Sequence, residues 1–577
     1  MGNTSNKAIA AVLREVALYK ELKGENPFKV RAFEGAAHSV ETHPEEVALL
    51  AKEGTLETIK GVGKGVAEVI REYIEVGHSS QLEQLRSSFP QSIAELFRVP
   101  GMGPKKIKAV WESLGVSSIG ELEYACMENR LISLEGFGEK SQEKILKAIA
   151  FIKLHQDRRL YSEALEVAED ILDTLREHEP SIAGSLRRGK NTFKDIDILV
   201  VSDETGDAEK LRSELLSLAD EDGVIASGTT KVSVRRHGLQ VDFRIVEKRS
   251  FPTAFQHFTG SKEHNTIIRA RAKRIGLKLN EYGVFRDENP LDVSSEQDVY
   301  RALDLEYIPP EIREGEDEVD ASEKGTLPVL MQGEDIHGMI HVHSTYSDGS
   351  NSIEALAEEC KRLGYSYLCI SDHSRSAFYA HGLSIEALRA QIEEVKRVNA
   401  KLDTFRVFCG VESDILSDGG LDYPDDVLRE LDFVIGSVHS RLMMSSEEAT
   451  DRLLKAIANP YLTILGHMSG RLLLSREGYG FDEDSILEAL GENGVVLEHN
   501  CNPHRLDPDW PFMKRAKRMG VLVSVNPDAH SLEGFSDMRY GITMARKAWL
   551  EKKDVLNCMT AEEIDGFFKG RKQKKGI

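Results

Sequence analysis

Two stretches of the sequence bring together residue types that bind metal ions. In "GSLRRGKNTFKDIDILV" (184–200), Asp195 and Asp197 stand one residue apart inside an apolar run. Residues i and i+2 of a strand face the same side, so the two carboxylates project together and repel each other unless cations are present. Asp242, in "VDFR", also ends an apolar run and is the expected third carboxylate.

Three carboxylates of this kind can hold two Mg²⁺ or Mn²⁺ ions roughly 3.5–4 Å apart, which suits phosphoryl transfer. One ion would lower the pKa of an attacking hydroxyl, and the other would hold the triphosphate that carries the leaving group. The preceding turn adds Ser185 and Arg188 for phosphate oxygens. A solvated pair of aspartates at a strand end is the ordinary interpretation of D-x-D alone, and the neighbouring "GSLRRG" and "VDFR" argue against it.

The second stretch, "IHVHSTYSDG", places His341 and His343 on one side of a strand. Other potential ligands lie at or just beyond the ends of later apolar runs: Asp372, His373, Glu412, His439, His467, Asp528 and His530. The strand ends of a parallel barrel meet at one rim, so residues far apart in the sequence can share a site there. A core histidine is the ordinary interpretation of any one of them, but their repetition indicates a cluster that suits Mn²⁺, Zn²⁺ or Fe²⁺.

One glycine pattern occurs three times in the first 150 residues, which otherwise consist of short amphipathic helices. The copies are "IKGVGKGVAEVI" (59–70), "VPGMGPKKIKAV" (99–110) and "LEGFGEKSQEKIL" (134–146). In each, a G-x-G turn precedes a Lys-bearing helix whose free N–H groups can hold a phosphate oxygen without contacting a base. A Gly-stopped turn is the ordinary interpretation of one copy, but three copies together resemble the helix-hairpin-helix element of DNA-binding proteins.

Further along the chain, helices alternate with strands. The segment around "VSVRRHGLQVDFRIV" predicts a hairpin of strands, and residues 316–335, acidic with Pro and Gly, are expected to form a linker. Later runs such as "MIHVHS", "YLCISDHS" and "GVVLEHN" each precede a helix, which predicts a parallel sheet, and their number indicates a barrel.

The composition is that of a globular, multidomain chain of 577 residues. No long apolar run predicts a membrane span, and the N-terminal residues lack the apolar core of a signal peptide. The six cysteines form no CxxC pair, which fits a reducing cytoplasm. The net charge of −22 does not exclude a nucleic-acid partner, because basic residues cluster locally, as in "RARAKRIGLKLN".

The first stretch resembles the family X DNA polymerases, the relatives of DNA polymerase β, and the similarity continues through "HFTGSKEHNTIIRARAKRIGLKLNEYGVF" (257–285). It implies catalysis at Asp195, Asp197 and Asp242. The implied nucleotide contacts are Ser185, Arg188, Gly189 and Arg159 at the phosphates, with Phe258, Gly260 and Asn265 at the sugar and base. The implied DNA contacts are Arg269 at the template strand, and Gly61, Gly63, Gly65, Gly101, Gly103, Lys105 and Lys29 in the helical region.

The second stretch resembles the PHP (polymerase and histidinol phosphatase) family, whose sites are trinuclear and lie on a distorted barrel. By that resemblance, the first ion is held by His341, His343, Glu412 and Asp528, the second by Glu412, His439 and His467, and the third by Asp348, His373 and His530. His381 and Arg441 are implied phosphate contacts.

Together the two resemblances predict a multidomain fold: a helical helix-hairpin-helix region, an α/β nucleotidyltransferase palm and a C-terminal distorted (β/α) PHP barrel. The expected boundaries are 1–84 and 85–152 for two helical DNA-binding parts, 153–247 for the palm, 248–315 for the nascent-base-pair-binding subdomain (the thumb), 316–335 for the acidic linker and 336–577 for the barrel.

The predicted function is gap filling in DNA repair by a monomeric polymerase, with primer-template or gapped DNA and dNTPs as its partners. The barrel would add a metal-dependent 3′→5′ exonuclease, with cleavage at abasic sites as a second candidate reaction. One alternative is a PHP phosphoesterase, with a small phosphomonoester as a competing substrate, on a DNA-binding platform. Another is a polymerase whose barrel is a non-catalytic scaffold.

One position departs from the polymerase pattern. In relatives with 5′-deoxyribose-phosphate lyase activity, a Schiff-base lysine lies on the helix after the first G-x-G turn, where this sequence has Val69. A valine cannot form an imine, and Lys64 is on the turn itself, so lyase chemistry by that route is expected to be absent. Lys29 and the turn backbone are still expected to bind a 5′-phosphate at a gap.

Overall fold

The computed structural model describes residues 5–90, 92–127, 131, 134, 136–155, 158–202, 208–442, 444–474 and 477–577. They divide into two compact units: Met1–Gln156 with Leu474–Arg476, and Asp157–Leu473 with Glu477–Ile577. The second unit contains the predicted palm, thumb and barrel.

The first unit is helical around one apolar core that extends from Ile9 to Ile152. Its helices are α1 (Asn6–Lys23), α2 (Pro27–Glu41), α3 (Val47–Glu53), α4 (Lys64–Val76), α5 (Ser80–Arg86), α6 (Ile93–Leu96), α7 (Pro104–Leu114), α8 (Ile119–Met127) and α9 (Glu139–His155). Side chains start the first two: Ser5 accepts from Ala8 N–H, and Asn26 accepts from Phe28 N–H. Short helices joined by glycine turns therefore form this unit, as predicted.

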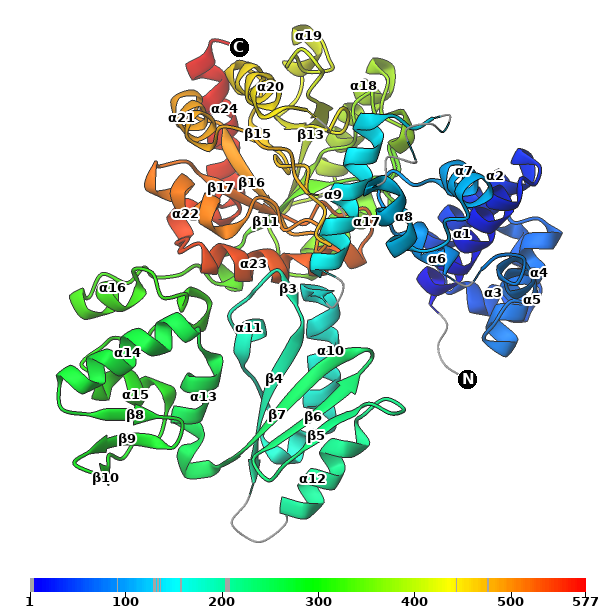
Figure 1. Cartoon of the computed structure of the whole chain (residues 1–577). Coiled ribbons are helices and arrows are strands. Elements are labelled where there is room, and N and C mark those ends of the chain that lie inside the picture. The colour runs from blue at the N-terminus through cyan, green and yellow to red at the C-terminus, as the bar shows by residue number, and fades with distance from the viewer. Residues whose placement is uncertain are drawn as a thin grey trace. The chain divides into compact units, whose positions relative to one another are not determined.

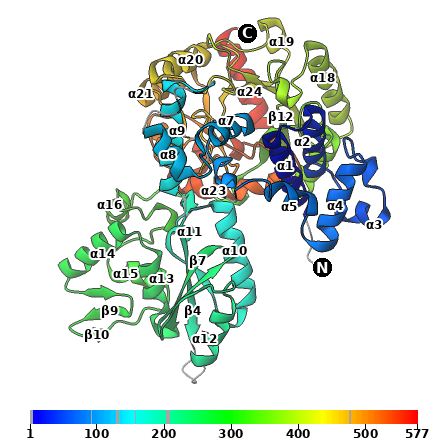
Figure 2. The ribbon, with the colours of Figure 1, turned by 45° about the vertical axis from the view of Figure 1, so that its right-hand side comes forward.

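The palm is a five-stranded sheet in the order β2-β4-β7-β6-β5, beside the thumb in both ribbon views (Figures 1 and 2). Its strands are β2 (Ser181–Ile182), β4 (Asp195–Ser202), β5 (Val224–Ser227), β6 (Lys231–Arg236) and β7 (Leu239–Glu247), with helices α10 (Tyr161–Thr174), α11 (Gly184–Arg187) and α12 (Ala208–Ser217). A separate pair, β1 (Arg159–Leu160) and β3 (Thr192–Phe193), lies beside it. Strands β6 and β7 form the predicted hairpin, and β4 runs parallel to β7.

The thumb has its own apolar core and a small antiparallel sheet in the order β10-β9-β8. Its elements are α13 (Phe251–Thr259), α14 (Lys262–Arg274), β8 (Lys278–Asn280), β9 (Gly283–Arg286), β10 (Asn289–Pro290), α15 (Glu296–Ala302) and α16 (Glu318–Lys324). The predicted linker, 316–335, is folded: it contains α16, and Val319 and Leu330 are buried in the thumb core. The domain boundaries themselves stay predictions.

The C-terminal part is a seven-stranded parallel sheet whose strands follow one another in chain order, as a barrel requires. They are β11 (Gly338–Val342), β12 (Tyr367–Ile370), β13 (Arg406–Asp414), β14 (Phe433–Ser437), β15 (Ile464–Leu465), β16 (Val496–Asn500) and β17 (Val523–Asn526). The helices are α17 (Ile353–Arg362), α18 (Ile385–Asn399), α19 (Asp425–Leu428), α20 (Ser446–Ala458), α21 (Glu483–Asn493), α22 (Trp510–Arg518), α23 (Met538–Lys547) and α24 (Ala561–Lys575). A bridge between Val342 and Ala529 nearly closes the sheet, which confirms the distorted barrel.

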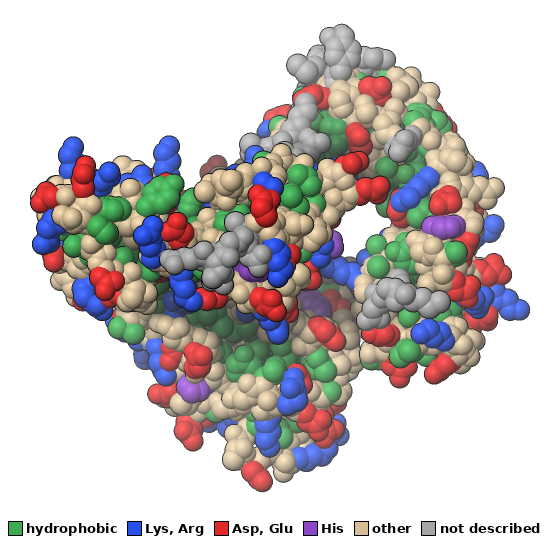
Figure 3. Space-filling model, turned by 90° about the horizontal axis from the view of Figure 1, so that it is seen from below, with side chains coloured by type: hydrophobic (Ala, Val, Ile, Leu, Met, Phe, Trp, Pro, Cys, Tyr) green, Lys and Arg blue, Asp and Glu red, His purple; other side chains and the backbone are tan. Residues whose placement is uncertain are grey.

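The surface carries charges of both signs. On the face shown in Figure 3, Lys and Arg side chains are interspersed with Asp and Glu. Within the described ranges, no helix is both long enough and apolar enough to cross a membrane.

Candidate metal centres in the palm and the barrel

The palm carboxylates lie on adjacent parallel strands. Asp197 of β4 is directly opposite Asp242 of β7, and Asp195 lies two residues before Asp197 on the same face. Burial and, after it, the charges of Asp195 and Asp242 raise the pKa of Asp197 to about 6. This repulsion is of the kind that a bound divalent cation relieves, so the donor set fits metal binding.

Asp242 has partners that the sequence did not point to. Lys231 Nζ lies 2.6 Å from Asp242 Oδ2, and Gln240 Nε2 donates to Oδ1 at 3.0 Å. Although burial raises the pKa of Asp242, hydrogen bonds from Lys231, Ser233 and Gln240 hold it below its usual value. Among the described residues, the three palm carboxylates do not form a group with all ligand atoms within 4.8 Å of one another. Two-ion binding at Asp195, Asp197 and Asp242 stays a prediction.

The "GSLRRG" segment forms a tight turn against the carboxylates. Gly184 has a φ of +60°, and a Cβ added there would lie 2.2 Å from Asp197 Oδ2. Only glycine therefore allows α11 to begin beside this carboxylate. Ser185 lies within α11, while Gly189, with a φ of +65°, ends the segment.

One of the predicted phosphate-binding arginines, Arg188, has protein partners in this structure. Arg188 is buried; it donates to the carbonyl oxygen of Thr259, and its Nε lies 3.4 Å from Glu314 Oε1. Arg159, in β1, lines a pocket together with Glu163 and Asp170. Their roles at a triphosphate stay predictions.

The predicted base-pair contacts lie together in the thumb. Asn265 donates to the carbonyl oxygen of His257 at 2.7 Å, and the Phe258 ring lies under the Arg244 guanidinium at 4.7 Å. Arg269 Nη2 lies 2.9 Å from His257 Nδ1. Gly260 ends α13 with a φ of +73°, and a Cβ there would lie 3.0 Å from Arg188 Nη1. Gly260 thus adjoins the phosphate-binding turn, although no contact with nucleotide or DNA is tested.

The helical unit repeats one glycine geometry. The first glycine of each turn, Gly61, Gly101 or Gly136, has a φ between +82° and +86°. The second glycine, Gly63 or Gly103, precedes α4 or α7 directly, so the first N–H groups of these helices have no capping side chain. Residue 135, in the third copy, lies outside the described residues.

The other predicted DNA contacts of the helical unit lie at its surface, whereas the valine at the lysine position is buried. The predicted DNA contacts Lys29, Gly65 and Lys105 are exposed. Val69 is buried at 3 % exposure, and Lys64 is the first residue of α4. DNA contact and the absence of lyase activity stay predictions.

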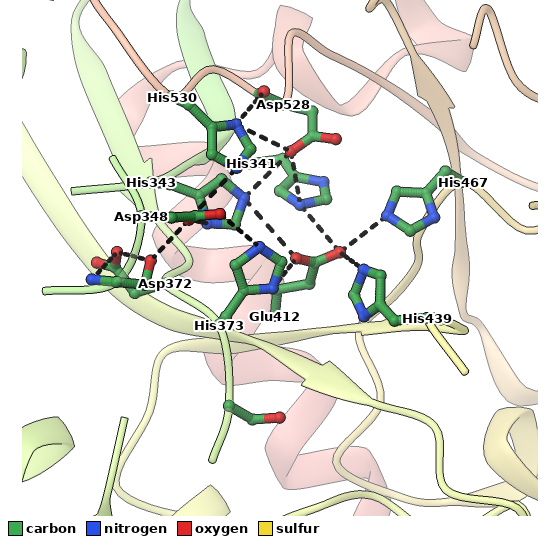
Figure 4. Close-up of polar contacts among 12 residues, drawn as sticks. His341, His343, Asp348, Asp372, His373, Glu412, His439, His467, Asp528 and His530 are labelled. Carbon is green, nitrogen blue, oxygen red and sulfur yellow. Dashed lines mark hydrogen bonds and ion pairs between the residues drawn. The ribbon is translucent and has the colours of Figure 1, made fainter. Parts of the chain in front are cut away.

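In the barrel, Glu412 lies at the centre of a cluster of imidazoles (Figure 4). Its Oε1 lies 3.3 Å from His341 Nε2, 3.3 Å from His439 Nε2 and 2.9 Å from His467 Nε2. Its Oε2 lies 2.9 Å from His373 Nδ1. The side chain is almost fully buried. Because Glu412 belongs to two of the ligand groups, its position is compatible with the predicted bridging role, which stays a prediction.

Two more carboxylates complete the cluster. Asp528 Oδ1 lies 3.1 Å from His343 Nε2 and 3.4 Å from His341 Nε2. Asp348 lies 3.4 Å from His530 Nε2 and 3.7 Å from His373 Nε2. All nine predicted ligands therefore lie together.

The groups of these ligands overlap the predicted sets without matching any of them. Ligand atoms of His343 lie with those of His341 and Asp528, and also with those of Asp348, His373 and His530. Those of Glu412 lie with His341 and His467 in one group and with His373 and His439 in another. The predicted sets placed His343 with the first ion and His373 with the third alone. The assignment of ligands to individual ions stays a prediction.

Some imidazole nitrogens of the cluster are buried without a hydrogen bond, which is what a site for divalent metal ions requires. Within the described part of the chain, His343 Nδ1 and His467 Nδ1 are buried without a hydrogen-bond partner. Native structures rarely bury such atoms unsatisfied, and a metal ion is a common reason. His341 and Asp528 also have positive φ values of 64° and 52°, and strained backbone of this kind clusters at functional sites.

Buried polar residues orient the ligands, and the sequence analysis missed them. Glu498 Oε1 lies 2.5 Å from His341 Nδ1, and Asp414 Oδ1 lies 2.5 Å from His439 Nδ1. Asn500 Nδ2 donates to Asp528 Oδ2 at 3.0 Å. Such partners fix the ring orientation of a metal-binding histidine. Glu498 and Asn500 end the "GVVLEHN" strand on one face, a signal available from the i, i+2 rule.

Three other barrel residues were considered for the site from the sequence. Asp372 is fully buried and accepts hydrogen bonds from Ser344 and Ser347, so it supports the loop after β11 and is no member of the ligand groups. His381 and Arg441 are exposed and have positive φ values, and their phosphate contacts stay predictions.

Comparisons with known proteins agree with this architecture. Family models match at 4–79 (helix-hairpin-helix domain), 93–150 (SAM-like helix-hairpin-helix tandem), 254–314 (DNA polymerase beta thumb) and 340–502 (PHP domain). The chain is 40 % identical over 572 residues to the DNA polymerase/3′-5′ exonuclease PolX of Bacillus subtilis (strain 168), covering 98 % of this chain and 99 % of that protein.

The C-terminal part has further relatives. It is 28 % identical over 248 residues to a protein named "Probable phosphatase" of Thermoanaerobacter sp. (strain X514), covering 41 % of this chain and 96 % of that protein. A second so named, from Caldanaerobacter subterraneus subsp. tengcongensis, is 30 % identical over 206 residues, covering 33 % and 74 %. The match along almost the whole Bacillus protein decides the family. The chain belongs to the bacterial family X DNA polymerases that carry a C-terminal PHP domain.

Proposed function

We propose that this chain is a template-directed DNA polymerase that fills short gaps in DNA repair and that its barrel is a metal-dependent 3′→5′ exonuclease. One observation carries the proposal: a chain matched end to end by a DNA polymerase/3′-5′ exonuclease contains two separate carboxylate centres, one in the palm and one in the barrel. Gapped DNA and dNTPs are the proposed partners, for a monomer in the cytoplasm.

In the palm, Asp195, Asp197 and Asp242 would hold two Mg²⁺ or Mn²⁺ ions. When bound, such ions would activate the primer hydroxyl and neutralise the negative charge of the dNTP triphosphate, from which pyrophosphate leaves. Ser185 and Arg188 would orient the phosphates, and the thumb residues Phe258 and Asn265 would check the new base pair. Contacts in the minor groove suit this check because they test pair geometry without reading the sequence.

In the barrel, His341, His343, Asp348, His373, Glu412, His439, His467, Asp528 and His530 would hold up to three Mn²⁺, Zn²⁺ or Fe²⁺ ions. Such ions, when bound, supply a nucleophile at neutral pH and stabilise charge on phosphate oxygens. Glu498 and Asp414 would keep the imidazoles oriented. The natural substrate beside a polymerase is a DNA 3′ end, with abasic-site cleavage as a second reaction of the same centre.

Separation of the two activities tests the proposal. Asp197→Ala is expected to abolish dNTP incorporation on a gapped duplex and to leave Mn²⁺-dependent 3′ degradation. His341→Ala is expected to do the reverse. If either substitution removes both activities while the chain remains folded by circular dichroism, the two-centre account is wrong.

A second candidate for the barrel is a phosphomonoesterase, which the matches to the two phosphatases favour. It differs in substrate and not in the metal centre. Release of phosphate from p-nitrophenyl phosphate or a DNA 3′-phosphate, without degradation of a 3′-hydroxyl strand, would favour it over the exonuclease.

A further inference from the structure

A buried lysine of the barrel reaches the palm. Lys547 ends α23, the helix that lies along the boundary between barrel and palm (Figure 1), and is only 2 % exposed. Its Nζ donates to the carbonyl oxygen of Arg188 at 3.0 Å, to that of Glu311 at 3.2 Å and to the carboxylate of Glu314. An ammonium has three N–H donors, so this lysine is fully used at the junction.

The same helix packs against the turn that contains Arg188. A Cβ added at Gly189 would lie 2.5 Å from Thr543 Cγ2 and 3.2 Å from Met544 Cε. Nearby, the rings of Tyr161 and Tyr540 are 5.4 Å apart between centroids. The end of the "GSLRRG" turn is therefore formed in part by the barrel.

Lys547 and Arg188 share one carboxylate. Glu314 Oε1 lies 3.4 Å from Arg188 Nε and is the same oxygen that Lys547 contacts. Away from bulk water, the Glu314 carboxylate interacts strongly with a neighbouring cation, whether Lys547 or Arg188. Without the lysine, Glu314 would pair with Arg188 alone, and a nucleotide phosphate would have to displace it.

We propose that Lys547 of the barrel is a positioning residue for the polymerase reaction: it holds the Arg188 turn in place and occupies Glu314, so that Arg188 is available to the phosphates of the incoming dNTP. The inference rests on the proposed polymerase function. By this proposal the barrel contributes a residue to the nucleotide site of the palm, in addition to the nuclease activity proposed for it.

The test measures KM and kcat for a dNTP on a single-nucleotide gap, with Mn²⁺-dependent 3′ degradation as the check on barrel folding. Lys547→Met is expected to raise KM about tenfold, the effect of one charge-assisted hydrogen bond, with kcat and degradation within about twofold. In the double variant, Lys547→Met with Glu314→Gln, the KM is expected to return most of the way to the wild-type value. Lys517→Met is the matched control, because Lys517 bonds only within the barrel, to the carbonyl oxygen of Trp549 and to Glu551.

Each outcome decides the proposal. An unchanged KM in Lys547→Met, or no recovery when Glu314→Gln is added, would overturn it. If Lys547→Met does not fold, Glu314→Gln alone decides: a KM at or below wild type supports the proposal, and a raised KM overturns it, because a purely structural junction would be damaged by either change. Wild-type chain that incorporates no dNTP would instead refute the proposed polymerase function.

Discussion

Glu498→Gln is expected to weaken metal binding by the barrel without affecting the palm. Glu498 is fully buried and is not among the predicted ligands. Its carboxylate accepts from the backbone N–H of His467 at 2.7 Å and from Asn526 Nδ2 at 2.7 Å. Its Oε1 lies 2.5 Å from His341 Nδ1. The amide keeps the shape of the side chain but replaces one acceptor oxygen with a donor NH₂ group.

The magnitude follows from these contacts. The carboxylate contacts two N–H donors and one imidazole nitrogen, so the new NH₂ group must face a donor, or else His341 must reverse its protonation. Losing one charge-assisted hydrogen bond costs roughly 1.5–3 kcal/mol, which corresponds to about 10–100-fold in metal affinity. The expected result is therefore a shift of the Mn²⁺ dependence by that factor.

The assay is 3′ degradation of a labelled single strand across a Mn²⁺ titration, with bound metal measured by mass spectrometry. Activity of the variant should recover at high Mn²⁺, and dNTP incorporation should remain at the wild-type rate. Glu488→Gln, on the exposed face of α21, is the matched control. A wild-type Mn²⁺ midpoint in Glu498→Gln, or a parallel loss of polymerisation, would show that Glu498 does not support the ligands.

Asp197→Asn should stabilise the metal-free chain by roughly 1–3 kcal/mol at pH 8, because it removes a charge buried beside two carboxylates. Since the pKa of Asp197 is raised from 3.8 to about 6, wild-type stability in thermal unfolding should fall as the pH rises from 3.8 to about 6 and level off above it, and the variant should lack this slope. Glu296→Gln should cost roughly 3–5 kcal/mol in urea unfolding, because Arg187 and the buried Arg313 lose their shared carboxylate. Those arginines lower the pKa of Glu296 to about 2, so its contribution should be present above pH 4.5 and lost as the pH falls toward 2. EDTA should lower the unfolding temperature, since ions at 100 times their Kd stabilise a fold by about 2.7 kcal/mol; an unchanged temperature would argue against bound metal.

The candidate ligands were predictable because they obey local rules. The i, i+2 spacing places Asp195 with Asp197 and His341 with His343, whatever the rest of the fold does. Likewise, ligands at the ends of parallel strands must approach one rim, so eight of the nine ligands could be predicted to meet, while Asp348 came only from the family resemblance. Both inferences need only the strand geometry and the chain order.

The partners of these residues were not predictable, because they depend on register and on contacts between domains. Lys231 reaches Asp242 only because β6 and β7 pair in one register, which the sequence leaves open. Arg188 was predicted from its motif, but its contacts with Thr259 and Glu314 arise from the thumb and the segment after it. The positive φ of His341 comes from an irregularity in β11, and nothing in "IHVHS" signals it.

The acidic composition of the chain is explained in part by pairing inside the molecule. Residues 316–335 were expected to form an acidic linker, but basic residues of α22 and α23 contact acidic residues at its start and just before it: Arg546 with Glu311, Lys547 with Glu314, Lys514 with Glu316 and Arg518 with Asp317. These charges neutralise one another at close range, so they add nothing to the field that a DNA strand meets beyond about one Debye length, roughly 10 Å. A net charge of −22 is therefore compatible with DNA binding, provided that the faces toward the DNA keep their unpaired lysines and arginines.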